Sequence, residues 1–330
     1  MTAIPWIDHY GCFYAAHGDD ITSDSNGEDC YRFVKAVGRF AVFRRTPSIS
    51  TTDLVGRMLL CTKTHFIKSF PEYLGITPDG RVYDDPSSEE AERLQRVKDY
   101  ASDETGHNPG PEVFLWMAPE EAKIGGHEHV GKFTKAIAGV GPSVDQRTVY
   151  VDGGFDLFSS GHIEFLKRVY QAEGGEAYIV AGIHEDGVIN HWKGLNYPIM
   201  NTFERGLCVL QCTYINAVIF GAPFSPSKPY LDSMPYGKVA AVYHGPTSFI
   251  PLTYDPYSAA MEMGIFRQIG EHAFSHVNAG EIVTRILKGR QAFEERQKKK
   301  GEKAFGEEAV RRREQMEAEA AELAEKRQVQ

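Results

Sequence analysis

The chain has 330 residues, of which 42% are hydrophobic and 25% charged, so extensive disorder and collagen-like repetition are excluded. Its formal net charge of -9 argues against a general nucleic-acid binder, because affinity for phosphate backbones depends on clustered Lys and Arg. No apolar run approaches the roughly 20 residues that span a bilayer, and the first residues lack the pattern of a signal peptide. The five cysteines have no disulfide-framework spacing, so we expect an intracellular protein.

One segment of the chain occurs twice. Residues 17–60 and 244–287 align by eye: His17 corresponds to His244, and DLVGRML at 53–59 corresponds to EIVTRIL at 281–287. Both strings have the spacing of an amphipathic helix. A long α/β stretch precedes the second copy but not the first, so we expect the first copy to lack its front half.

Between the two copies, the sequence has two parts with different patterns. Residues 62–146 are loop-like around one charged helical run, SEEAERLQRVKDYA at 88–101, and are predicted to be a linker with some helix. From Thr148 onward, strands and helices alternate. Strands are predicted at 148–158, 177–186, 216–223 and 238–245, and helices at 161–173 and 199–213.

This alternation predicts the fold class. Strands separated by helices of this length form βαβ units, so we expect an α/β fold with a doubly wound parallel sheet that binds its ligand at the carboxyl ends of the strands. The tail is rich in Glu, Lys, Arg, Gln and Ala, which is typical of a solvated helix or disorder. The predicted divisions are a remnant of the first unit at 1–61, a linker at 62–146, the second unit at 147–291 and the charged tail at 292–330.

Four short motifs of the second unit suit phosphate groups. Gly153 and Gly154 end a strand and lead to a helix start, where backbone N–H groups favour an anion. Lys193 precedes a glycine, His244 ends a strand, and Arg267 precedes a polar turn. Each motif alone is typical of an ordinary turn or a solvated side chain, but the four in this order favour phosphate binding.

No metal site is predicted. His127 and His129 have the spacing of ligands on a strand, but a Gly-rich surface loop is the favoured interpretation. Cys208 and Cys212 could form half of a zinc site, but no matching pair follows at zinc-site spacing.

On longer strings, the chain resembles the ethanolamine-phosphate cytidylyltransferase family, whose members carry two tandem cytidylyltransferase units. RTPSISTTDLVGRMLL at 45–60 resembles the end of a first unit. VYVDGGFDLF at 149–158, KGLNYPIMNTFERGLCVL at 193–210 and GIFRQI at 264–269 resemble a second unit. The resemblance implies the Rossmann-like nucleotidyltransferase sheet and the conversion of CTP and phosphoethanolamine to CDP-ethanolamine and diphosphate, with Mg²⁺, in phosphatidylethanolamine synthesis.

The resemblance also implies site residues. His162 matches the second histidine of the HxGH signature, and the residues expected to be catalytic are His162, Lys193 and Arg267. Those expected to bind CTP or its phosphates are Gly154, Phe155, Asp156, Ser159, Ser160, Gly161, Arg205, His244, Gly245, Pro246, Thr247, Gln268, Ile269, Gly270 and Glu271. In the first unit, the matching loops hold His17, Gly18, Asp19, Asp20 and residues 45–52.

Two departures from the family pattern leave an alternative open. Ser159 stands where the first signature histidine is expected, and loss of one such donor typically costs roughly 10²- to 10³-fold in rate. Asn278–Glu281 replaces the Ser-Thr-Thr-Asp of residues 50–53. The alternative to the enzyme is a non-catalytic CTP-binding or scaffold relative.

The expected partners are the small molecules CTP and phosphoethanolamine, with no nucleic acid and no transmembrane segment. Phosphocholine enzymes share the phosphate machinery, and the tandem arrangement is what favours ethanolamine. We expect a cytoplasmic protein; peripheral attachment to the endoplasmic reticulum and a homodimer both stay open.

Overall fold

The computed structural model describes residues 2–20, 22–43, 50–77, 79–125, 131–246, 254–290, 295 and 298–299. Thr247, His127, His129, residues 44–49 of the first unit's loop and nearly all of the predicted tail at 292–330 lie outside the described residues. The chain divides into two compact units, one of residues 1–50 with 289–330 and one of residues Thr51–Lys288.

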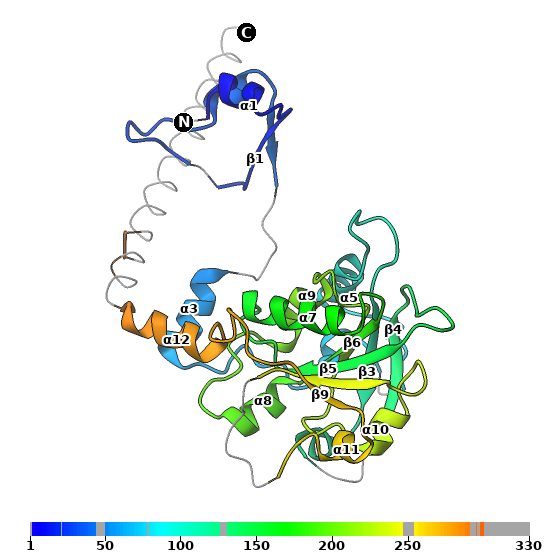
Figure 1. Cartoon of the computed structure of the whole chain (residues 1–330). Coiled ribbons are helices and arrows are strands. Elements are labelled where there is room, and N and C mark those ends of the chain that lie inside the picture. The colour runs from blue at the N-terminus through cyan, green and yellow to red at the C-terminus, as the bar shows by residue number, and fades with distance from the viewer. Residues whose placement is uncertain are drawn as a thin grey trace, which may run out of the picture. The chain divides into compact units, whose positions relative to one another are not determined.

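The larger unit is built on one seven-stranded sheet, in the order β4-β3-β7-β6-β5-β8-β9 (Figure 1). All neighbouring strands are parallel except β3 and β4. The central strands are buried on both faces and read as continuous apolar runs, as parallel sheets require. The strands are β3 (Glu112–Met117), β4 (Lys132–Ile137), β5 (Thr148–Gly153), β6 (Tyr178–Ile183), β7 (Ala217–Phe220), β8 (Ala241–His244) and β9 (Phe266–Gln268).

Helices cover both faces of this sheet (Figure 1), which confirms the doubly wound α/β prediction. Successive strand residues point to opposite faces, so Val149 and Val151 pack on one side while Tyr150 packs on the other. The first face carries α5 (Ser88–Tyr100), α7 (Ser160–Ala172) and α9 (Thr202–Leu210). The second face carries α10 (Lys228–Asp232) and α11 (Ser258–Glu262).

The two repeated helices pack against each other. They are α3 (Thr51–Leu60) and α12 (Ala279–Lys288). The amphipathic spacing of both strings predicted that they are helices. Met58 of α3 is buried in one cluster with Ala279 of α12. The other helices of the larger unit are α4 (Phe70–Tyr73), α6 (Glu120–Ile124) and α8 (Asp186–Lys193).

The predicted linker differs from the structure. Two of its segments are strands of the main sheet, with β3 pairing in parallel with β7 and β4 forming an antiparallel edge. Helix α3, placed by sequence with residues 1–61, belongs to the larger unit. The run EVFLWM has no alternation of buried and exposed residues. Periodicity alone therefore cannot distinguish a buried strand from a buried helix at this place.

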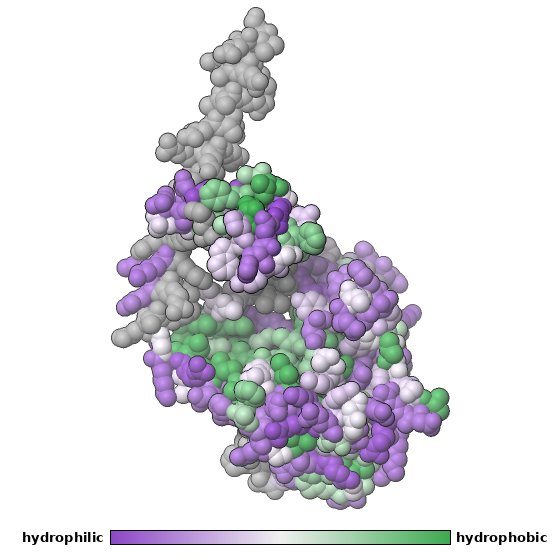
Figure 2. All heavy atoms as spheres, turned by 45° about the horizontal axis from the view of Figure 1, so that its top comes forward, coloured by the Kyte–Doolittle hydropathy of each residue, from purple (hydrophilic) through white to green (hydrophobic). Residues whose placement is uncertain are grey.

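The smaller unit contains α1 (Ile4–His9), β1 (Ala15–His17), α2 (Arg32–Ala36) and β2 (Phe40–Val42). β1 and β2 pair in parallel, as β8 and β9 do in the larger unit. Apolar residues show among polar ones on the face drawn in Figure 2, and Phe13 of this unit is 82% exposed. None of the helices in the described ranges is long and apolar enough to cross a membrane.

Candidate active site

A cavity of about 350 Å³ opens at the carboxyl ends of β5 and β8. This is the edge at which doubly wound sheets bind ligands. The end of β5, the first turn of α7, the last residue of α8, the end of β8 and the segment 272–280 all contribute to its wall. The residues predicted from sequence that line it are Gly154, Phe155, Asp156, Gly161, His162, Lys193, His244, Gly245 and Pro246.

The turn between β5 and α7 is tied to a second loop by Asp156. Its carboxylate is buried and accepts hydrogen bonds from the backbone N–H groups of Ile199 (2.8 Å) and Met200 (2.9 Å). Burial raises the pKa of Asp156, and the two backbone donors partly oppose that rise. The turn after β5 is therefore held to the loop 194–201, which begins directly after Lys193.

His162 lies in the first turn of α7 with a fixed tautomer. Its Nδ1 accepts the backbone N–H of Ser159 at 3.1 Å, so the ring proton resides on Nε2. Burial, helped by the positive charge of Lys193, lowers the pKa of His162 to about 4. Phe158 stacks on the ring at 5.4 Å between centroids. At neutral pH the residue is therefore an uncharged, oriented N–H donor at the cavity.

The first turn of α7 also approaches the segment before α12 closely. A Cβ atom on Gly161 would lie 2.5 Å from the carbonyl oxygen of Val277, so only glycine fits without movement. The 13-residue helix directs its positive end and its first backbone N–H groups toward this edge of the sheet. An anionic group is the ligand that such a wall favours.

Lys193 supplies a cation at the end of α8. Gly194 follows with φ of 67°, a left-handed conformation that ends the helix. Asn190 donates to the carbonyl oxygens of Gly194 (3.2 Å) and Tyr197 (2.8 Å), which orders the following loop. Burial lowers the pKa of Lys193, and the charge of Asp156 opposes this. A lysine so placed suits a phosphate as a point charge.

Asp152 was not among the predicted site residues, yet it lines the cavity at the end of β5. Its Oδ1 accepts a hydrogen bond from the hydroxyl of Tyr257 (2.5 Å), whereas its Oδ2 is buried and has no hydrogen-bond partner among the described residues. Burial raises the pKa of Asp152 to about 7, and the hydroxyl groups of Tyr257 and Tyr150 partly oppose this rise. The available signal was an acidic residue at the end of the apolar string TVYV.

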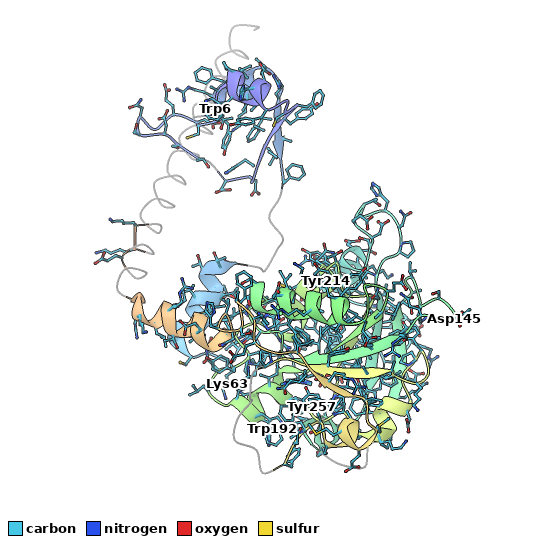
Figure 3. All side chains as sticks on the ribbon, viewed as in Figure 1. Trp6, Lys63, Asp145, Trp192, Tyr214 and Tyr257 are labelled. Carbon is cyan, nitrogen blue, oxygen red and sulfur yellow. The ribbon has the colours of Figure 1, made fainter. Side chains whose placement is uncertain are left out.

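Tyr257, which donates to this carboxyl group, contacts further aromatic rings. Tyr257 and Trp192 lie on the side of the sheet that carries α10 and α11 (Figure 3). The ring of Tyr257 lies 4.8 Å from that of His244, and Trp192 stacks on Phe224 at 4.7 Å.

The cavity thus combines phosphate-compatible donors with a buried carboxyl group. Comparisons with known proteins bear on the family of the whole chain. Ethanolamine-phosphate cytidylyltransferase of Mus musculus is 35% identical over 302 residues, 91% of this chain and 71% of the mouse protein. The enzyme of the same name from Dictyostelium discoideum is 34% identical over 298 residues, 89% of this chain and 72% of its own. The chain belongs to the ethanolamine-phosphate cytidylyltransferase family.

Other comparisons are weaker. Choline-phosphate cytidylyltransferase A of Rattus norvegicus is 26% identical over 160 residues, which cover 46% of this chain and 40% of the rat protein. No model of a protein family matches the chain. Cytidylyltransferases are nucleotidyltransferase enzymes, so the family agrees with the Rossmann-like sheet predicted from sequence.

Several residues carried over from the family pattern do not line the cavity. Arg205 is fully buried, and its guanidinium donates to the carbonyl of Gly154 (2.6 Å) and to Asp186 (2.8 Å), among other acceptors. Because its donors bind acceptors inside the protein, Arg205 stabilises the edge of the sheet and does not face a ligand. Ser159 donates from Oγ to the carbonyl of Val277 (3.1 Å), and Ser160 is exposed.

The segment expected to close over the nucleotide is also displaced along the chain. Arg267, in β9, is exposed and donates to the carbonyls of Gly264 (3.1 Å) and Phe266 (2.7 Å). Arg267 and the residues after it, Gln268, Ile269, Gly270 and Glu271, are not part of the cavity wall. His272, Ser275, Val277, Asn278, Ala279 and Gly280 line it instead.

The residues at the cavity do not fit a resident Mg²⁺ ion. The described part of the chain contains no group of three or more His, Cys, Asp or Glu that could hold a metal. Both oxygens of Asp156 accept backbone N–H groups, which leaves one buried oxygen of Asp152. Mg²⁺ needs several oxygen ligands and is commonly shared with substrate phosphates. Any Mg²⁺ would therefore have to be held mainly by a substrate.

Proposed function

We propose that the chain transfers a cytidylyl group from CTP to phosphoethanolamine. A phosphate oxygen of phosphoethanolamine forms a bond to the α-phosphorus of CTP. The bond from that phosphorus to the bridging oxygen breaks, and diphosphate leaves with the bond's electron pair. The products are CDP-ethanolamine and diphosphate. No protein nucleophile is needed, so the residues act by positioning the substrates and stabilising charge.

The phosphate-binding part of the proposal uses three features of one wall. The first turn of α7 supplies backbone N–H groups, His162 supplies its Nε2–H, and Lys193 supplies a positive charge. Because the pKa of His162 is about 4, this residue donates a hydrogen bond without exchanging a proton at neutral pH. We propose Mg²⁺ only as an ion that arrives with the triphosphate, and no step here runs through it.

The feature of the cavity that supports ethanolamine is the unsatisfied oxygen of Asp152. A primary ammonium carries three N–H donors, whereas a trimethylammonium carries none. The buried Oδ2 of Asp152, which has no hydrogen-bond partner in the described ranges, would accept one of those donors. The positive charge would also favour the ionised carboxylate over the neutral acid that burial favours.

The test is formation of CDP-ethanolamine from CTP, Mg²⁺ and phosphoethanolamine by the purified chain. We expect His162→Ala and Lys193→Ala to reduce turnover by about 10²-fold or more. The matched controls, His107→Ala and Lys98→Ala, change exposed residues far along the chain from the cavity and should leave turnover unchanged. CTP binding without turnover would overturn the proposed activity while leaving the family assignment intact.

We propose a cytoplasmic location with peripheral association with the endoplasmic reticulum. The reasons are that both substrates are water-soluble and that the expected pathway ends in a membrane lipid. Fractionation with and without salt would test the association. Light scattering on the purified chain would test the further proposal of a homodimer.

A further inference from the structure

The end of the first sequence copy holds the loop that follows Lys193. Arg57 of α3 forms a double ion pair with Glu204 of α9, with Nη–Oε distances of 2.7 and 2.9 Å. Arg57 is 8% exposed and Glu204 is 6% exposed. The two helices lie about 150 residues apart in the chain. The Arg57–Glu204 ion pair joins them next to the loop 194–201.

Arg57 also contacts the loop itself. Its Nη1 donates to the carbonyl oxygen of Ile199 (3.0 Å), and its own carbonyl accepts from Nδ2 of Asn196 (2.8 Å). Met58, the next residue, is buried in a cluster with Ile199 and Met200. The loop is therefore held by α3 through polar and apolar contacts together.

The segment that follows α3 adds further contacts. Nε2 of His65 donates to the carbonyl of Pro198 (2.8 Å), and Lys63 donates to the side chain of Asn190 (2.9 Å). Lys63 lies close to α8 in Figure 3. The backbone N–H of Ile67 donates to Asp186 at the first residue of α8 (2.9 Å). Both ends of α8 are thus bound by residues that precede the main sheet in sequence.

Ile199 connects the α3 contacts with the cavity. Its N–H donates to Asp156, a cavity residue, and its C=O accepts from Arg57. One peptide segment is therefore fixed from the cavity side and from the α3 side. If the α3 contact is lost, the donors to Asp156 and the loop that continues from Lys193 lose the support that lies opposite the cavity.

We propose that Arg57 is a positioning residue for the CTP site, acting through the loop 194–201 on Asp156 and Lys193. This inference rests on the proposed function, but its structural part can be tested separately. It means that the first copy of the repeat contributes to the site of the second unit. The repeat counterpart in α12, Arg285, is exposed and forms no hydrogen bond or ion pair with this loop among the described residues.

The test uses the double variant Arg57→Met/Glu204→Gln. Removing Arg57 alone would leave a buried carboxylate uncompensated and could unfold the chain, whereas removing both charges avoids this. A glutamine can still accept the N–H of Asn201, which Glu204 accepts at 2.9 Å. We expect the variant to fold with a similar melting temperature. The KM for CTP should rise by about 10- to 100-fold, with a smaller fall in kcat.

Hydrogen exchange supplies a readout that does not need turnover. The amides of Ile199 and Met200 should lose protection in the double variant, while amides of β5 and β6 keep theirs. Arg57→Lys should be intermediate, since lysine cannot form the paired geometry. Arg285→Met is the matched control and should change neither amide protection nor KM.

The outcomes separate the two proposals. A folded double variant with unchanged KM for CTP and unchanged protection of Ile199 and Met200 would overturn the role of Arg57. If the unaltered chain forms no CDP-ethanolamine, the proposed function fails. In that case amide exchange and calorimetric CTP binding by the same variants still test Arg57.

Discussion

The buried carboxyl group of Asp152 should make the chain less stable as pH rises. Its pKa is raised from 3.8 to about 7 because the group is buried, so between these values the folded chain retains a proton that the unfolded chain has released. The stabilisation is complete below about pH 3.8 and is lost as pH rises through about 7. At about 1.4 kcal/mol per pH unit, the difference corresponds to about 4 kcal/mol.

Asp152→Asn removes this titration while keeping the shape of the side chain. The free energy of unfolding of the variant, minus that of the unaltered chain, should therefore increase with pH, by about 4 kcal/mol between pH 4 and pH 8. The slope is the diagnostic quantity, because a new buried amide donor adds a constant cost of about 1–3 kcal/mol at every pH. Urea unfolding at several pH values measures it.

Phosphoethanolamine should act on the same group. Its ammonium would favour the ionised carboxylate, so binding at pH 6 should release a proton, which calorimetry in buffers of different ionisation enthalpy detects. The ligand should stabilise the unaltered chain more than the Asn variant. A stability difference that stays constant from pH 4 to pH 8 would refute the assignment of this titration to Asp152.

Three further predictions concern α7. Gly161→Ala should lower the melting temperature by several degrees, because the new Cβ would lie 2.5 Å from the carbonyl oxygen of Val277. This loss should outweigh the higher helix propensity of alanine, which is about 1 kcal/mol. An unchanged melting temperature would show that the segment around Val277 moves to make room. Ser159→Ala should destabilise the chain by about 1 kcal/mol through loss of an N-cap residue. It should change kcat/KM less than about threefold, and a 10²-fold loss would instead return Ser159 to the catalytic group. Because the pKa of His162 is lowered to about 4, the stability that neutral His162 contributes is present above pH 6.5 and is lost as pH falls toward 4. A pH–rate profile should therefore show no step from this residue between pH 8 and pH 6. A step near pH 6.5 that disappears in His162→Gln would contradict this.

The sequence predicted the strands of the larger unit well where an apolar, β-branched run ended at glycine or polar residues. β5, β6, β7 and β8 all lie within their predicted ranges, because β-branched runs bounded by turns have few other structures open to them. β3, β4 and β9 were missed. β3 and β4 are flanked by charged and loop-like residues, and β3 joins the sheet by pairing with β7, which lies about 100 residues further along the chain, while β4 pairs with β3.

The candidate site was predicted best at the ends of strands. Gly154 and Asp156 directly follow β5 and His244 ends β8, and all three line the cavity because the carboxyl ends of parallel strands meet at one edge of the sheet. Arg205 and Arg267 could not be placed in this way. Which acceptors a guanidinium finds depends on tertiary contacts, and Arg205 finds its acceptors inside the protein.

The position of α3 determines where the gene for this protein can be shortened. The repeat suggests a natural boundary after Cys61, at the end of the first copy, but a fragment that began there would lack Arg57 and Met58. Glu204 would then be a buried acid with no guanidinium beside it, and the apolar cluster around Ile199 and Met200 would be open to water. A fragment that begins at Ser50 keeps both contacts, so a deletion series across residues 50–62 should show an abrupt loss of soluble expression once α3 is cut.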